Sequence, residues 1–245
     1  MNPEAFAEAK SNADIAPCLS VVMPVYNEEA TVTKVLETVL KQRPVQEVVV
    51  VDDGSADKTG EKLEAFAKTE PRVKLFRQTS NQGKGAALRK GFQQATAPVV
   101  IVQDADFEYD PAEYYLLLSP IVGGKADVVL GSRLIGAGAH RVLYFWHSMG
   151  NKFLTLLSNI GTDLNCTDIE SGYKAFRREV IQGITLEENR FGFEPEIVAK
   201  VAKLKLRIFE VPISYYGRTY AEGKKIGWKD GVSALRCILK YNFLR

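Results

Sequence analysis

Four apolar runs of strand length recur through residues 19–132, and they constrain the fold of this chain more than any other feature. They span residues 19–25, 47–52, 99–104 and 127–132. Their central positions are apolar without alternation, which is typical of strands covered on both faces of a sheet. A shorter run at 73–76 is a weaker strand candidate.

Helical patterns separate these runs. Residues 32–40 carry valine and leucine at the i, i+3, i+4, i+7 and i+8 positions of a buried helix face. Residues 63–67 do so more weakly, and Gly83-Lys84-Gly85 opens another helix that runs through Ala95. Strands that alternate with helices form βαβ units, so we predict an α/β fold with a mainly parallel central sheet flanked by helices.

The pattern changes after Arg133. Helices are predicted near 142–160, 195–204 and 228–241, and a strand that continues as an extended segment over 207–216. Residues 1–17 show no strand or buried-helix pattern, so we expect a flexible N-terminal arm there. Residues 18–245 are expected to form a single domain, whose second half, about 134–245, builds on the first, about 18–133.

The composition excludes several classes of protein. The 32 basic and 30 acidic residues give a net charge of +2, and 46% of the residues are hydrophobic. This balance argues against a disordered chain and against a nucleic-acid partner. No stretch approaches the ~18–20 apolar residues that span a bilayer, and residues 1–17 have no signal-peptide core. We therefore expect a cytoplasmic protein.

Cysteine usage agrees with that compartment. Cys18, Cys166 and Cys237 lie far apart and show no metal-binding spacing. We expect reduced thiols and no zinc cluster. Cys237 falls on the apolar face of a predicted helix, where packing is its default role.

Polar residues gather where the predicted strands end. Ligands of open α/β sheets bind beyond the carboxyl ends of the strands. Four strands, taken as neighbours, here end in acids, an amide, a tyrosine and an arginine: Tyr26, Asn27, Glu28, Asp52, Asp53, Asp104 and Arg133. Singly, Asn27 can be a helix cap and residues 52–55 a simple turn. Together at one edge they predict a ligand site.

The sharpest pattern within this set is Asp104, Asp106 and Glu108. In an extended chain alternate residues share a face, so the three carboxylates would point the same way. Carboxylates brought together repel one another unless a cation lies between them. Oxygen ligands of this kind suit Mg²⁺ or Mn²⁺. The alternative is a solvated acidic turn that leads into a helix at Pro111.

The segment Asn81-Gln82-Gly83-Lys84-Gly85 is a weaker signal. Its two glycines at a helix start would let backbone amides approach a phosphate, with Lys84 adding charge. The segment is not a Walker loop, and no G-x-G-x-x-G follows the first strand, so a dinucleotide site of the usual kind is not expected.

The motifs PVYNE (24–28), VDDGSAD (51–57), NQGKG (81–85), QDADFEYDP (103–111) and GSR (131–133) occur in the order that resembles inverting family 2 glycosyltransferases of the GT-A fold. Downstream, TDIESGYKAF (167–176), RFGFEPEI (190–197) and residues 211–231 resemble the polyprenyl-phosphate branch, typified by dolichol-phosphate mannose synthase. The resemblance covers about residues 19–241. The ordered set is highly specific, whereas D-x-D alone is weak.

The resemblance implies a donor site and a metal site in the first half. A nucleotide-sugar would lie against Pro24, Tyr26, Glu28, Asp53, Lys84 and Asp104. Mg²⁺ or Mn²⁺ on its diphosphate would be held by Asp104, Asp106 and Glu108, where Glu108 replaces the glutamine that relatives often have.

For the second half, the resemblance implies an acceptor site. Arg133, Arg141 and Arg218 would bind an acceptor phosphate, and Asp106, Arg133 and Asp168 are the expected catalytic residues. Arg218 falls in a segment like the family's mobile acceptor loop, which also carries Lys224 and Lys225. For each lysine, a solvated charge run remains equally open.

The implied reaction is direct displacement at the anomeric carbon of a hexose by an acceptor oxygen. A polyprenyl phosphate is already anionic at pH 7 and needs positive charge more than deprotonation. A hydroxyl acceptor would instead need a general base, for which Asp168 and Glu196 are candidates. At a helix start, Glu194 and Glu196 can equally serve the helix dipole. A catalytically silent scaffold relative is the remaining alternative.

The two histidines titrate near neutrality and are candidate bases, but a structural or membrane-surface role is favoured for His147. His147 lies among Tyr144, Phe145 and Trp146 on a predicted amphipathic helix, and His140 precedes that helix. The aromatic stretch could lie against lipid headgroups. Many relatives carry transmembrane helices after the point where this sequence stops, so we expect any membrane contact to be peripheral, at a cytoplasmic face, or to be made through a partner.

Overall fold

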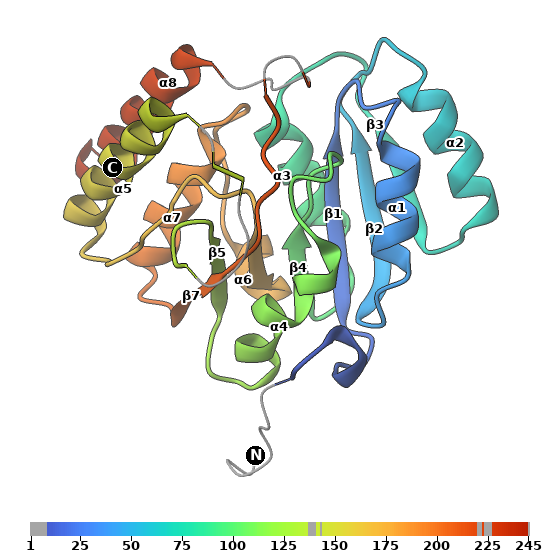
Figure 1. The fold of residues 1–245 in the computed structure, drawn as a ribbon, viewed down its shortest axis with the longest axis horizontal. Coiled ribbons are helices and arrows are strands. Elements are labelled where there is room, and N and C mark those ends of the chain that lie inside the picture. The colour runs from blue at the N-terminus through green and yellow to red at the C-terminus, as the bar shows by residue number, and fades with distance from the viewer. Residues whose placement is uncertain (1–8, 137–140, 143, 220–221, 223–226, 245) are drawn as a thin grey trace.

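The computed structural model of the chain describes residues 9–136, 141–142, 144–219, 222 and 227–244. Within these residues the chain forms a seven-stranded sheet in the order β3-β2-β1-β4-β6-β5-β7 (Figure 1). Its strands are β1 (Leu19–Val25), β2 (Val45–Asp52), β3 (Val73–Arg77), β4 (Val99–Val102), β5 (Val128–Ser132), β6 (Lys174–Arg177) and β7 (Ile208–Pro212). The α/β class is confirmed, including the weaker strand at 73–76.

The sheet is parallel except at β6, which runs antiparallel to both β4 and β5. The sequence prediction missed β6, because its four residues form no extended apolar run. The expectation that β1, β2, β4 and β5 are all neighbours is therefore wrong, because β6 lies between β4 and β5. Because β6 is reversed, its beginning lies at the edge where the parallel strands end.

Different helices cover the two faces of the sheet. Val21 belongs to a core with Leu36 and Leu117, whereas its neighbour Val22 belongs to a second core with Leu88. The first face is covered by α1 (Val32–Leu40), α2 (Thr59–Thr69) and α4 (Tyr114–Val122). The second is covered by α3 (Lys84–Gln94), α6 (Arg178–Gly183) and α7 (Phe193–Lys203). Burial on both faces explains why the central strands are apolar throughout.

Two further helices lie side by side at one end of the molecule, α5 (Phe145–Thr162) and α8 (Trp228–Leu239), with a short π-helical turn at Lys240–Leu244 (Figure 1). Both agree with the predicted helices at 142–160 and 228–241. No helix in the described part of the chain is both long and apolar enough to cross a bilayer.

The segment before β1 is packed where the structure describes it. A short 3₁₀ turn, Asn12–Asp14, buries Asn12, whose amide donates to Gln42 Oε1 at 2.8 Å and to the carbonyl of Pro111 at 2.9 Å. Ile15 joins the first core. Residues 12–15, which fall within the predicted N-terminal arm, thus contact the rest of the domain.

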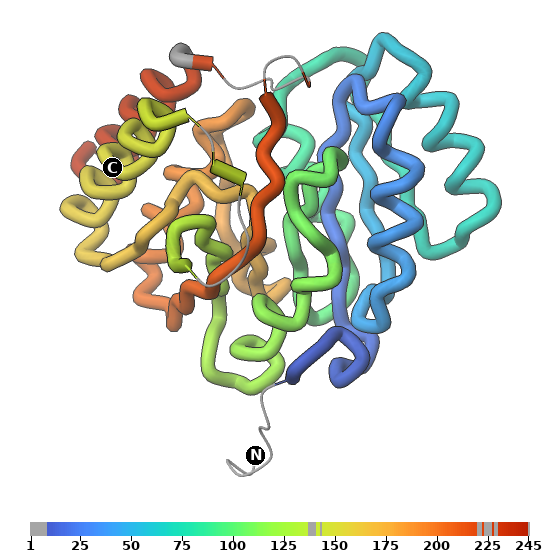
Figure 2. Tube along the Cα trace, viewed as in Figure 1, coloured from blue at the N-terminus to red at the C-terminus, as the bar shows by residue number. Residues whose placement is uncertain are grey.

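Beyond β7, residues 213–218 form an extended strap that crosses the sheet edge beside the loop after β4, residues 103–110, called here the acidic loop. The red strap and the green acidic loop run next to each other in Figure 2. The Ser214 hydroxyl donates to Glu113 Oε1 at 2.6 Å, and the Tyr216 N–H donates to the Glu108 carbonyl at 2.9 Å. The strap brings Arg218 to the ends of β1 and β4, where it contacts Glu28 and Asp106.

Candidate active site

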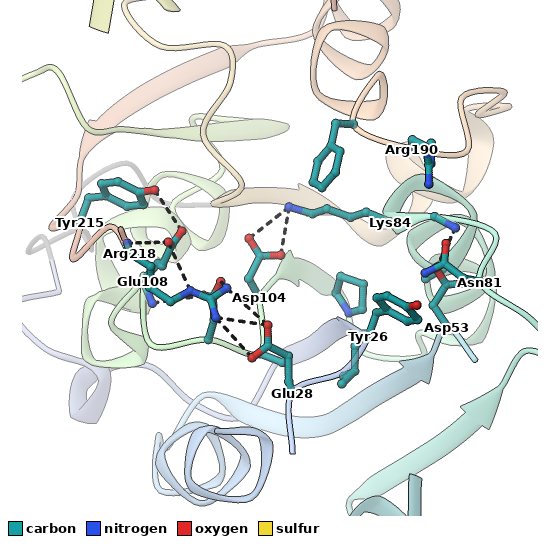
Figure 3. Close-up of a pocket in the computed structure, with 17 residues that line it drawn as sticks. Tyr26, Glu28, Asp53, Asn81, Lys84, Asp104, Glu108, Arg190, Tyr215 and Arg218 are labelled. Atoms are coloured by element: carbon teal, nitrogen blue, oxygen red, sulfur yellow. Dashed lines mark hydrogen bonds and ion pairs between the residues drawn. The ribbon is translucent and has the colours of Figure 1, made fainter. Parts of the chain in front are cut away.

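A cavity of about 310 Å³ opens at the carboxyl ends of β1, β2 and β4 (Figure 3). This size lies at the lower end of the range of small-molecule sites. Of the residues predicted for donor and metal, all line it: Pro24, Tyr26, Glu28, Asp53, Lys84, Asp104, Asp106 and Glu108. Arg218 also lines it, whereas Arg133, Arg141 and Asp168 do not.

The acidic loop is bent, not extended. Residues 105–109 form bends, and Phe107 has a φ of +34°, a left-handed conformation that non-glycine residues seldom adopt. The predicted reason for grouping Asp104, Asp106 and Glu108, alternation along an extended chain, is therefore wrong. The turn nevertheless directs all three carboxylates to one cavity.

Two cations hold these carboxylates, one on each side. Lys84 Nζ lies 3.0 Å from Asp104 Oδ1 and 3.2 Å from Glu194 Oε1. Burial acts to lower the pKa of Lys84, but the charges of Asp104 and Glu194 outweigh it and raise the pKa. Arg218 pairs with Asp106 Oδ2 at 2.5 Å and with Glu28 Oε1 at 3.3 Å. Figure 3 shows the contact of Lys84 with Asp104 and that of Arg218 with Glu28 as dashed lines.

The cavity keeps an excess of negative charge. Five carboxylates line it, against Lys84, Arg190 and Arg218. Burial and the charges of Asp104 and Glu108 raise the pKa of Asp106 to about 7, against the opposing charge of Arg218. A diphosphate is itself anionic, so it can enter this set only with added positive charge.

A divalent metal fits this need, because Asp104, Asp106 and Glu108 offer only hard oxygen ligands. In the described residues, however, no three acidic, histidine or cysteine side chains already form a metal cage. The carboxylates are engaged by Lys84 and Arg218 instead.

Asp53 organises the loop before α3. Its Oδ1 accepts from Gln78 Nε2 and from the Gln82 N–H, each at 2.8 Å, and its Oδ2 accepts from the Gly83 N–H at 2.7 Å. The two glycines of this loop serve packing: a Cβ on Gly83 would lie 2.3 Å from the Asn189 carbonyl oxygen, and one on Gly85 2.2 Å from that of Glu188. The predicted approach of this loop to a phosphate therefore competes with the chain at 188–189, which occupies that space.

Arg133 and Asp168 form a buried, two-pronged ion pair beside the cavity. Arg133 Nε and Nη2 donate to the two oxygens of Asp168 at 2.7 and 2.8 Å, and Asn151 Nδ2 adds a third hydrogen bond at 2.9 Å. Burial would raise the pKa of Asp168, but Arg133 and these hydrogen bonds hold it at about 2. Asp168 thus stays charged and fixes the direction of the guanidinium.

Tyr215 joins this pair to the acidic loop. Its hydroxyl donates to Glu108 Oε2 at 3.0 Å, and the Arg133 guanidinium carbon lies 5.0 Å from its ring centroid. The ring also lies 5.4 Å from Tyr109, whose hydroxyl accepts from the Gly172 N–H at 2.9 Å. The rings of Tyr215 and Tyr109 therefore connect Glu108, predicted to bind the metal, with Arg133, predicted to bind the acceptor.

The remaining predicted residues lie apart from the cavity. Arg141 pairs with Glu222 Oε2 at 2.7 Å and donates to the Gly217 carbonyl at 3.0 Å, at the end of the strap. Glu196 is buried and accepts the N–H groups of Glu187 and Glu188 at 2.7 and 2.9 Å. His147 lies on the exposed side of α5. His140, Lys224 and Lys225 lie outside the described residues.

Sequence reasoning missed several cavity residues. Asn81, Arg190, Phe191 and Tyr215 line the cavity but were assigned no role. Arg190 and Phe191 fall within the motif at 190–197, and Tyr215 lies in the motif at 211–231. The motifs were the available signal, but which of their side chains turn inward depends on how α7 and the strap pack.

A second set of charges lies behind Lys84. Glu170 Oε1 and Glu194 Oε2 are buried without a hydrogen-bond partner among the described residues. Burial, followed by the charge of Glu194, raises the pKa of Glu170 to about 8 against the opposing charges of Lys174 and Arg133, while Asp168 adds to the rise. Glu170 is therefore largely protonated at neutral pH.

This state predicts a pH-dependent effect of Glu170→Gln. A raised carboxyl pKa stabilises the folded chain at low pH, and this contribution is lost as the pH rises from about 4.5 towards 8. Glutamine has no such loss, so the variant should gain about 3 kcal/mol over wild type between pH 5 and pH 8. Urea unfolding at the two pH values measures this. Glu179→Gln, on an exposed side chain, is the control, and a pH-independent difference for Glu170→Gln would contradict the prediction.

The backbone of Gly172 lies so close to the Asp104 carboxylate that there is no room for a side chain at this position. A Cβ there would lie 2.7 Å from Asp104 Oδ2 and 3.2 Å from Lys84 Nζ. Gly172→Ala should therefore displace the Asp104 carboxylate and weaken Mn²⁺-dependent nucleoside diphosphate binding at least about tenfold. Calorimetric titration measures it. Gly183→Ala, which meets nothing within 4 Å, is the matched control and should bind as wild type does.

A mainly parallel sheet that ends in an acidic D-x-D loop beside a small-molecule cavity is the arrangement of sugar transferases of the GT-A fold. The sequence matches the family described as Glycosyl transferase family 2 over residues 20–185. The chain belongs to this glycosyltransferase family, and it is a glycosyltransferase.

Three relatives extend the match over most of the chain. It is 31% identical to an undecaprenyl-phosphate mannosyltransferase of Micrococcus luteus, covering 84% of this chain and 86% of the relative. It is 31% identical to a dolichol-phosphate mannosyltransferase of Pyrococcus furiosus, covering 85% and 59%. It is 30% identical to a polyprenol monophosphomannose synthase of Mycolicibacterium smegmatis, covering 84% and 80%.

Solved structures confirm the fold. Glucosyl-3-phosphoglycerate synthase of Mycobacterium tuberculosis, in a complex with Mn²⁺, UDP and glucosyl-3-phosphoglycerate, superposes with a TM-score of 0.71 at 21% identity, covering 92% of this chain and 80% of that one. The same enzyme with Mn²⁺ and UDP-glucose gives a TM-score of 0.72 at 20% identity, covering 92% and 79%.

Proposed function

We propose that this chain transfers a hexose from a UDP- or GDP-linked donor to a polyprenyl phosphate, with inversion at the anomeric carbon. The observation that carries the proposal is the charge arrangement of the site. The three carboxylates that would hold a metal line the cavity just after β4, with Arg218 paired to one of them and Arg133 stacked on Tyr215 beside them. The names of the relatives supply the acceptor class.

The donor would lie between the β1 end and the loop before α3. Tyr26 is 36% exposed in the cavity wall, and it offers a ring face to a base. Asp53 acts mainly by holding the loop at 81–83, because both of its oxygens already accept hydrogen bonds. Lys84 holds Asp104 in place at the centre of the cavity.

Mg²⁺ or Mn²⁺ is the cofactor we propose, held by Asp104, Asp106 and Glu108, where it would neutralise the charge that develops on the departing diphosphate. The acceptor phosphate oxygen forms a bond to the anomeric carbon as the bond from that carbon to the diphosphate oxygen breaks. The bonding electrons leave with the nucleoside diphosphate, and no proton transfer is required.

A phosphate acceptor agrees better with the geometry than a hydroxyl does. Both candidate bases are engaged: Asp168 is paired with Arg133, and Glu196 lies 2.6 Å from Lys200 and accepts two backbone N–H groups. A base that stays ionised through a buried ion pair is a weak proton acceptor. Arg133 is the residue that the pair orients.

The test is turnover with defined donors and acceptors. UDP- and GDP-hexoses are incubated with Mn²⁺ and a short-chain polyprenyl phosphate, and the product is analysed for linkage. An inverted hexosyl phospholipid is the expected product. Transfer to a sugar alcohol or to phosphoglyceric acid, with none to the lipid, would contradict the proposed acceptor and favour a hydroxyl substrate.

A lipid acceptor requires contact with a membrane, and α5 offers a surface for it. Its outward face exposes large apolar side chains: Phe145, Trp146, Met149, Phe153, Leu156 and Ile160, with Trp146 79% exposed. The adjoining α8 and the turn after it add Val232, Leu239, Phe243 and Leu244. Soluble monomers seldom expose so many apolar groups together. We propose that this surface lies against lipid headgroups.

Vesicle flotation tests this surface. Replacing Trp146 and Phe153 by serine should reduce binding to phosphatidylglycerol vesicles at least about tenfold, since each loses roughly 1.5–3 kcal/mol of apolar burial. Val122→Ser, at an exposed site on the opposite face of the sheet, is the control. Unchanged flotation of the double variant would exclude α5 as the membrane contact.

A further inference from the structure

The guanidinium of Arg218 lies against two of the three proposed metal ligands, Asp106 and Glu108. Its Nη2 lies 2.5 Å from Asp106 Oδ2 and 3.3 Å from Glu28 Oε1, and its Nε lies 3.6 Å from Glu108 Oε1. These carboxylates come from the β1 end and the acidic loop. A guanidinium is a cation that stays charged when it is partly buried. Arg218 thus takes the place of an ion among oxygen ligands.

The strap and this cation form one unit. Glu108 accepts the Arg218 N–H at 2.8 Å on Oε1 and the Tyr215 hydroxyl at 3.0 Å on Oε2, and its carbonyl accepts the Tyr216 N–H. Both carboxylate oxygens of a proposed metal ligand are therefore used by the strap. Moving Arg218 away from Asp106 requires these contacts to loosen as well.

Arg218 and a divalent ion are two cations for one set of carboxylates. Asp106 and Glu108 cannot bind both at contact distance, because the cations would repel each other at a separation of a few ångströms. The absence of a ready metal cage among the described residues agrees with this: the oxygens that would form it face the guanidinium. Only Asp104, held by Lys84, lies apart from Arg218.

We propose that Arg218 is a built-in counter-cation of the metal site, displaced together with the strap when a divalent metal binds. The inference rests on the metal site of the proposed function. Before metal binding, the strap packs on the acidic loop, and the charge of Arg218 reduces the repulsion between the carboxylates of that loop. After metal binding, the released guanidinium can bind a phosphate on the acceptor side. The metal therefore has to bind before Arg218 can bind the acceptor.

Titration of Mn²⁺ alone into the full chain tests the competition, with free Mn²⁺ followed by its EPR signal. Apparent affinity is reduced by the fraction of molecules in which the site is closed, so removing the competitor should raise it. We expect Arg218→Gln to bind Mn²⁺ at least about tenfold more tightly than wild type. Arg218→Lys keeps the charge but loses the planar guanidinium, so its Mn²⁺ affinity should lie between those of wild type and Arg218→Gln. Arg43→Gln, beside the start of β2 at the opposite edge of the sheet, removes the same charge and should match wild type.

Hydrogen exchange in wild type gives a second readout that does not depend on a variant. Peptides that cover 214–218 should exchange faster once Mn²⁺ is added, because the N–H groups of Tyr216 and Arg218 lose their acceptors. Equal Mn²⁺ affinity in wild type and Arg218→Gln, or slower exchange with Mn²⁺, would overturn the inference and leave the metal site standing. Failure of every variant to bind Mn²⁺, with or without UDP or GDP, would overturn the metal site and the inference together.

Discussion

Replacing Asp106 by asparagine should reduce hexosyl transfer at least about 10³-fold and abolish the enhancement of nucleotide binding by Mn²⁺. Asp106 lines the cavity, and its pKa is raised to about 7 by burial and by its acidic neighbours, so its charge is the one most in need of a cation. Asparagine keeps the shape but loses that charge, and the charge that develops on the departing diphosphate is then poorly neutralised.

Two measurements check this: initial rates of transfer, and calorimetric titration of UDP and GDP with and without Mn²⁺. Asp110→Asn is the matched control, because Asp110 lies in the same loop but caps the short helix at Pro111–Glu113 through the Ala112 N–H. Asparagine caps equally well, so this variant should behave as wild type does. An Asp106→Asn protein that still binds nucleotide more tightly with Mn²⁺ would exclude Asp106 as a metal ligand.

The sequence was most informative where one local pattern determines one local structure. The apolar runs predicted β1, β2, β4 and β5, and the positions just after them predicted most of the cavity. The length of an apolar run and the position where it ends are local properties of the sequence, and tertiary packing did not change the structures that they predict.

The remaining features depend on contacts between distant segments. The strand β6 pairs on both sides but has only four residues, so its own sequence carries little signal. Arg218 was predicted for the acceptor, yet it lies 2.5 Å from Asp106, across 112 positions of the chain. Pairing of this kind follows from the path of the strap. The bend at Phe107 likewise replaced the extended geometry expected of the acidic loop.

Arg133→Lys is expected to lower the catalytic efficiency with polyprenyl phosphate about 100-fold, mainly through a higher KM for the lipid. The binding of nucleotide with Mn²⁺ should stay within about twofold of wild type. The reason is geometric: Asp168 takes Nε and Nη2 of Arg133, and among the described residues none accepts a hydrogen bond from Nη1. Nη1 can therefore donate a hydrogen bond to a phosphate while the pair with Asp168 stays intact. A lysine ammonium lacks the planar arrangement of donors that would bind Asp168 and the phosphate together. Arg177→Lys, paired with Asp127 beyond the other end of β5, is the control.

Asp168→Asn separates a positioning role from a general-base role. The pKa of Asp168 is lowered to about 2, so its contribution to stability is present above the ordinary pKa of 3.8 and is lost only as the pH falls through 2. Across pH 5 to 9 the pair stays ionised, and the effect of Arg133→Lys should not vary with pH. Asparagine keeps an acceptor for Arg133, so we expect Asp168→Asn to lose about tenfold in transfer to the lipid phosphate. A loss beyond about 10³-fold, with a pH profile that loses its acidic limb, would instead show that Asp168 removes a proton from a hydroxyl acceptor.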